Sequence, residues 1–177
     1  MAKVTLKDIK SKFALLSPRE QEKLIGDLYG FSNETKRFLE QRLFGANIEP
    51  YLNDLERLTY DRFESTPPKL IVAKDVNRVL TQAKKAGLDE FGMMELHFYV
   101  FEAYVVYIDM FGISDEAIEN KCAMHLDKSL ALLKKVELPL EDKRNKFQEA
   151  IDIVDKHNNM YRDHLYDILD DYSFLFS

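Results

Sequence analysis

The sequence is poor in the residues that make tight turns and cross-links. Its 177 residues include 6 Gly, 5 Pro and a single Cys. So few glycines and prolines do not supply the many turns that an all-β fold requires. Because Cys122 is alone, no disulfide can form within the chain, and the chain cannot assemble a thiolate zinc site. A reducing, cytoplasmic setting is therefore expected.

The chain also lacks a long apolar segment without charges. Residues 1–12 are too polar for a signal peptide. The most apolar stretch, residues 91–111, is long enough to span a bilayer, but it carries Glu95, Glu102 and Asp109. It is better interpreted as a central core helix, so neither export nor a membrane partner is expected.

A strong positive charge is absent as well. The net charge is -6 at pH 7, whereas a domain that follows a phosphate backbone needs a basic excess. Nucleic acid is therefore not an expected partner. The hydrophobic fraction of 46% and the charged fraction of 32% are typical of a folded chain, and the length fits one domain covering residues 1–177.

What the sequence does contain is helical periodicity with clear start and stop signals. The clearest start is Ser17, Pro18 and Glu20, which supply a hydroxyl cap, a proline in the first turn and an acid that reaches back to the cap. Gly30, Gly45 and other glycines are expected to end helices. The predicted helices cover residues 5–16, 18–29, 33–44, 50–63, 68–86, 90–111, 115–136 and 141–171, the last being either one helix or two with a break at Asn158 and Asn159.

These segments predict an all-α fold. We expect an irregular bundle of about eight helices, with short N-terminal hairpins and longer central and C-terminal helices. Thr66, Pro67 and Pro68 interrupt the helical pattern. They predict an internal joint at residues 65–68, between an N-terminal helical subdomain (1–64) and a larger bundle (69–177).

One candidate site is a line of acids on the central helix. Glu95, Glu102 and Asp109 recur every seven residues, which places them near one face. The same pattern also fits a narrow solvated strip on an otherwise apolar helix. His157, His164 and Asp167 follow at helical spacing near the C-terminus. A metal site joining the two helices is one hypothesis, although no HExxH or Glu-x-x-His motif is present and no cofactor is expected.

The second candidate is the aromatic C-terminal end. Tyr172, Phe174, Leu175 and Phe176 form an unusually apolar tail. Such a tail either folds back to cover the core or stays exposed as a contact for a partner protein or a second copy of the chain. Both alternatives remain open at this point.

The chain resembles a family of uncharacterised bacterial proteins that are classed only as a domain of unknown function. The similarity is carried by Leu15, Leu16, Ser17, Glu20, Leu24, Ile25, Leu28 and Tyr29, then by Lys36, Phe38, Leu39, Glu40 and Leu43, and more loosely by Pro68, Lys69, His164, Tyr166 and Asp167. Members of that family are expected to carry a Gly-Trp-Gly turn near the C-terminus, whereas this sequence contains no Trp. The resemblance implies a bacterial, cytoplasmic, helical protein and brings no activity with it.

The sequence thus favours a non-enzymatic helical protein-interaction or adaptor module. A metal-assisted hydrolase, with Glu95, Glu102, His157, His164 and Asp167 as its weak candidates, is the first alternative. A structural homo-oligomer is the second. Phosphate loops, dinucleotide fingerprints and nucleophile elbows are absent from the sequence, so no motif for ordinary nucleotide-dependent chemistry is recognised in it.

Overall fold

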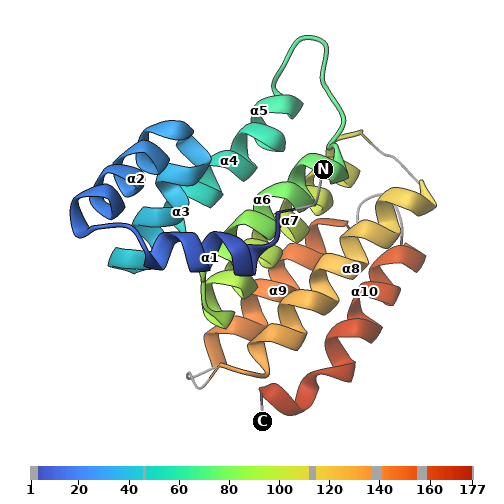
Figure 1. Cartoon of the computed structure of the whole chain (residues 1–177). Helices are drawn as coiled ribbons and strands as arrows, with labels where there is room; N and C mark the ends of the chain where they lie inside the picture. Colours follow the sequence, from blue (N-terminus) through green and yellow to red (C-terminus); the bar gives the residue numbers. More distant parts are fainter. Residues whose placement is uncertain (1–3, 46, 112–114, 137–140, 155–158, 177) are drawn as a thin grey trace. The chain divides into compact units, whose positions relative to one another are not determined.

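The fold is all-α (Figure 1). The computed structural model describes residues 4–45, 47–111, 115–136, 141–154 and 159–176, and these residues form helices and turns without a strand. The chain divides into two compact units, residues 1–45 and residues 46–177. They are called the N-terminal unit and the main unit below, and each is described by itself.

The N-terminal unit consists of α1 (Leu6–Ala14), α2 (Pro18–Phe31) and α3 (Asn33–Phe44). The cap predicted at Ser17 for the second helix is confirmed. The Glu20 carboxylate accepts a hydrogen bond from the Ser17 backbone N–H at 2.8 Å, and the Ser17 hydroxyl accepts one from the Glu20 backbone N–H. Such reciprocal capping satisfies N–H groups that the helix itself cannot pair.

Ser32, and not Gly30, separates α2 from α3. Gly30 lies inside α2, and the extended backbone of Ser32 (φ -160°) ends α2 and caps α3 at once. Its hydroxyl accepts a hydrogen bond from the Thr35 N–H at 3.1 Å. This strong cap decides where the chain leaves the helix, because a glycine inside a helix is only mildly unfavourable. Gly45 ends α3 as predicted, with a φ of 102°.

The N-terminal unit buries little apolar surface. Its α2 packs against α3, and the Tyr29 hydroxyl donates to Glu40 at 2.8 Å across this pair. Even so, the inward-facing Leu28 and Phe38 are 39% and 42% exposed, and no hydrophobic side chain of the described residues 4–45 is buried. The caps therefore matter more to these helices than they would to helices held by a core.

The main unit is built around one long helix (Figure 1). Its central α7 packs mainly against α8 and also contacts α4, α6 and α9, while α10 lies against α8 and α9. Its elements are α4 (Glu49–Leu58), α5 (Tyr60–Phe63), α6 (Ala73–Ala86), α7 (Glu90–Phe111), α8 (Glu116–Leu133), α9 (Glu141–Ile153), α10 (Asn159–Asp171) and a 3-10 turn (Ser173–Leu175).

The central position of α7 follows from its composition. Twelve of its 22 residues are buried, and they point to nearly every side of the helix. A helix that is apolar almost all round is stable only where other helices cover it. The largest buried side chains of the core include Phe101 and Tyr104 of α7, Leu126 of α8 and Phe147 of α9.

Three helix starts or breaks differ from the predictions. α8, predicted over 115–136, extends from Glu116 to Leu133, with Asp115 as its cap; the Asp115 carboxylate accepts a hydrogen bond from the Ala117 N–H at 2.8 Å. The predicted helix over 50–63 is divided at Thr59, whose hydroxyl donates to the Leu55 carbonyl. α6 begins at Ala73, so the prolines at 67–68 precede it in a non-helical connection.

The division of the chain also differs from the predicted joint. It falls after Gly45, whereas residues 65–68 connect α5 to α6 within the main unit. Local hydrogen bonds hold this connection, because Lys69 N–H donates to the Arg62 carbonyl at 2.9 Å and the Arg62 guanidinium donates to the Leu70 carbonyl. The C-terminal segment forms two helices, α9 and α10, although Asn158 itself lies outside the described residues.

Candidate functional site

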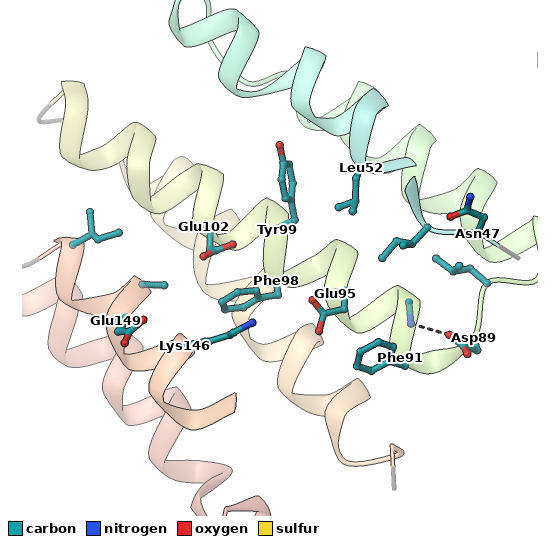
Figure 2. A pocket seen from close by; sticks show the side chains of 15 residues that line it. Asn47, Leu52, Asp89, Phe91, Glu95, Phe98, Tyr99, Glu102, Lys146 and Glu149 are labelled. Atoms are coloured by element: carbon teal, nitrogen blue, oxygen red, sulfur yellow. Dashed lines mark hydrogen bonds between the residues drawn. The ribbon is translucent and has the colours of Figure 1, made fainter. Parts of the chain in front are cut away.

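The main unit carries a groove with a volume of about 1040 Å³. Its floor is the N-terminal half of α7, one wall is the start of α4, and the other wall is α9 (Figure 2). All of the residues that line it belong to the main unit. The lining residues are Asn47, Ile48, Leu52, Leu88, Asp89, Phe91, Gly92, Glu95, Phe98, Tyr99, Glu102, Lys146, Glu149, Ala150 and Ile153.

The floor of the groove contains two of the three predicted acids. Glu95 and Glu102 both line it, and Phe98 and Tyr99 lie between them on the same face of α7. These four side chains are half-buried, whereas most of α7 is buried. Asp109 is half-buried too but does not line the groove. The sevenfold spacing therefore identified the one strip of α7 that other helices leave partly uncovered.

The walls of the groove are apolar on one side and mixed on the other. Ile48, which precedes α4, and Leu52 of α4 supply aliphatic surface. The α9 wall presents Lys146 and Glu149, with the lysine side chain extending toward the floor near Phe98 (Figure 2). The groove thus combines apolar walls with a few charged groups, as protein sites for organic ligands usually do.

A tight turn between α6 and α7 shapes the end of the groove at the start of α7. Gly87 ends α6 with a φ of 96°, a left-handed conformation that glycine adopts without strain. The Asp89 carboxylate then caps α7 by accepting a hydrogen bond from the Gly92 N–H at 2.8 Å. A Cβ at Gly92 would lie 2.6 Å from Leu88 Cγ, so glycine allows the turn to fold against the helix. This turn places Phe91, which is 37% exposed, at the rim.

The groove is negative. Four acids, Asp89, Glu95, Glu102 and Glu149, line it together with the single cation Lys146. Burial raises the pKa of Glu102 above its ordinary value; Lys146 opposes the rise and Glu95 adds to it. Burial disfavours the charged form of this carboxylate. A cationic ligand would stabilise the charged form by direct attraction. The arrangement is therefore suited to binding a positively charged group beside apolar surface.

Among the described residues that line the groove, the titratable side chains are four carboxylates, one lysine and one tyrosine. No His, Cys, Ser or Thr side chain is among these lining residues. The two floor acids lack a neighbouring nucleophile or imidazole base in this lining, and nucleophile–base pairs are the usual mark of covalent catalysis.

The structure separates the residues of the predicted metal site. Glu95 and Glu102 lie in the groove, but His164 and Asp167 are exposed on α10, which packs on α8 and α9, and they do not line the groove. His157 lies outside the described residues. Among the described residues, no group of three or more His, Cys, Asp or Glu side chains is arranged to hold a metal ion.

The aromatic C-terminal tail folds back onto the main unit. Tyr172, Leu175 and Phe176 are half-buried against the core, and the Tyr172 hydroxyl donates to Asp127 of α8 at 2.8 Å. Phe174 is 53% exposed, with the Lys134 ammonium 5.4 Å from the centre of its ring. Of the two alternatives for the tail, covering the core describes most of it, and Phe174 is its principal exposed apolar side chain.

The most unusual polar contact of the main unit was not predicted from sequence. His97 of α7 and His125 of α8 are buried, with their Nδ1 atoms 2.9 Å apart. Burial is the main cause that lowers the pKa of His97 to about 4 and that of His125 to about 3; the Lys128 charge contributes to both shifts, and His97 contributes to that of His125. One imidazole must donate and the other accept, so the pair is neutral and joins the two central helices.

Comparisons with known proteins do not identify this chain. No family model, no curated protein and no solved structure matches it. The resemblance inferred from the sequence therefore stays a prediction. None of the described helices is long and apolar enough to cross a membrane.

Proposed function

We propose that this protein is a non-enzymatic protein-interaction module and that the groove over α7 is its binding site. The observation that carries the proposal is the composition of the half-buried strip, in which Phe98 and Tyr99 lie between Glu95 and Glu102. Apolar and aromatic surface with a few fixed polar or charged groups is typical of binding sites, where the polar groups set the orientation of the ligand. The proposed setting is the cytoplasm, which suits the free thiol of Cys122.

The groove has the size and openness of a contact surface. At about 1040 Å³ it lies at the upper end of the range for small-molecule sites, which is roughly 300 to 1,000 Å³. Phe91 and Ile153 at its edges are each 37% exposed, so apolar surface continues to the rim. A protein segment would cover both the floor and this rim, whereas a small ligand would leave the rim in water.

Site-specific photo-crosslinking in the source cells tests this function. The photoreactive analogue p-benzoylphenylalanine replaces Phe91 in the groove or, in a matched variant, Phe174 in the C-terminal tail. Both phenylalanines are partly exposed and belong to the main unit. We expect one dominant protein adduct from position 91, identified by mass spectrometry of the cross-linked peptide.

A blocking substitution makes the test specific. Ile153→Arg introduces a cation at the edge of the groove, and Met110→Arg introduces the same side chain at an exposed α7 position that does not line it. The position-91 adduct should disappear with Ile153→Arg and persist with Met110→Arg. Adducts from position 174 alone would indicate that the partner contacts the tail. A position-91 adduct that forms equally well with Ile153→Arg would refute the groove as the site.

A further inference from the structure

We infer that the occupant of the groove is an amphipathic helix of the partner protein, with Lys or Arg at two positions seven apart and two large apolar residues between them. The inference rests on the proposed function and names the partner's chemistry. It follows from the order of side chains along the floor, where an acid, two aromatic residues and a second acid succeed one another as Glu95, Phe98, Tyr99 and Glu102.

The volume of the groove fits a helix. A helix about 10 Å across occupies roughly 120 Å³ per residue, since each residue adds about 1.5 Å of length. The groove volume of about 1040 Å³ therefore corresponds to roughly nine residues, or about two and a half turns. A helix of that length would lie over α7, between the α4 and α9 walls (Figure 2).

The spacing of the floor acids sets the spacing of the partner's cations. Glu95 and Glu102 are two turns apart, a rise of about 10 Å along α7. A helix lying along α7 repeats the same face every seven residues, so cations seven apart can meet both acids. Apolar residues three and four positions after the first cation would then reach Phe98 and Tyr99.

Charge complementarity supports a basic partner over an acidic or neutral one. The four acids of the groove face one lysine. Lys146 and Glu149 make the α9 wall mixed, so the partner's cations should point to the floor and not to that wall. The aromatic ring of Tyr99 adds a surface on which a guanidinium or ammonium group is favoured.

Peptide binding tests the inference directly. The probe is an 18-residue alanine-based peptide, blocked at both ends, with Lys at positions 5 and 12 and Leu at positions 8 and 9. A control peptide of the same composition carries its lysines at positions 5 and 10, which turns one of them away from the groove. Titration calorimetry on the full chain at low ionic strength should show roughly three- to fivefold weaker binding for the control peptide, because one of its two ion pairs is lost.

Charge variants of the protein supply the second arm. Glu95→Gln/Glu102→Gln should weaken binding of the first peptide at least tenfold and remove the preference between the two peptides. Glu116→Gln/Asp167→Asn, with the same change in net charge at exposed positions on α8 and α10, should leave binding unchanged. Equal losses in the two double variants would mean non-specific attraction and overturn the inference.

The remaining outcomes separate this inference from the proposed function. If neither peptide binds but the position-91 adduct forms and is blocked by Ile153→Arg, the groove binds a protein segment of other chemistry, and only the present inference is overturned. If spermidine displaces the first peptide at micromolar concentration with full dependence on Glu95 and Glu102, the site recognises small organic cations, and the helical occupant is wrong. Absence of both the peptide complex and the adduct overturns both.

Discussion

The buried imidazole pair makes the stability of the fold depend on pH in a way that can be calculated. His97 and His125 are 8% and 2% exposed, and one ring donates its Nδ1 proton to the other over 2.9 Å. With folded pKa values near 4 and 3, neither ring takes up a proton until the solution is strongly acidic. In the unfolded chain both should titrate near pH 6.5.

The sign follows from proton uptake. Below pH 6.5 the two imidazoles bind protons in the unfolded chain but stay neutral in the folded chain, so acid favours unfolding. At pH 5.5, one unit below the unfolded pKa, each imidazole lowers the free energy of unfolding by about 1.4 kcal/mol, and the pair by about 3 kcal/mol. This figure is insensitive to how low the folded pKa values lie, since it depends only on their staying below 5.5. The loss continues until the pH reaches the folded values near 4 and 3.

The measurement compares the protein with His97→Leu/His125→Leu, in which both polar partners become apolar groups of similar size. Urea unfolding followed by circular dichroism suits a chain that has no Trp. Between pH 7.5 and pH 5.5 the wild type should lose about 3 kcal/mol relative to the variant, while carboxylates common to both cancel. A relative loss of about half this size would mean that the pair shares one proton, and no relative loss would refute the neutral buried pair.

Three further predictions concern the groove and the tail. Affinity for the basic peptide should rise with pH as Glu102 ionises, because burial raises the pKa of Glu102 and a bound cation lowers that pKa. Calorimetry in two buffers of different ionisation enthalpy should detect the proton that Glu102 releases on binding. Gly92→Ala should cost about 1 to 3 kcal/mol through its clash with Leu88, whereas Gly26→Ala, with open space around it, should be neutral or stabilising in urea unfolding. Tyr172→Phe should cost about 1 kcal/mol in the same assay, since it removes a hydrogen bond to a carboxylate of α8.

The parts of the fold that sequence predicted well are those decided by neighbouring residues. The capping box at Ser17 and the left-handed stop at Gly87 depend on residues within one turn, so their effect is visible in the sequence. The division at Thr59 and the late start of α6 at Ala73 depend on how the segments pack, and no local signal marks them. The division between units after Gly45 depends on contacts throughout the chain, which the local interruption at the prolines 67–68 does not report.

The candidate site divides in the same way. The position of Glu95 and Glu102 on one face of α7 follows from helical spacing alone. The α9 wall of the groove does not follow from helical spacing, because α9 is about 50 residues away from Glu95 in sequence. In the sequence alone, nothing distinguishes Lys146 from other surface lysines. The histidine pair is equally non-local, since His97 and His125 are 28 residues apart. The hypothesis of a site shared with α10 included His157, which lies outside the described residues, whereas the groove over Glu95 and Glu102 is lined by residues of α9.

The order of residues on the α7 strip bears on whether solvation alone explains it. A strip that served only to expose charge would be expected to carry polar residues throughout, since apolar side chains at such positions lose the benefit of burial. Here the residues between Glu95 and Glu102 on that face are Phe98 and Tyr99, and both remain half-buried at the floor of a groove. Covering these rings would recover part of their burial energy, and an occupant that also brings positive charge would relieve the repulsion between the acids. The two gains require the same ligand, which is why the groove, and not the acidic line by itself, is the feature to test.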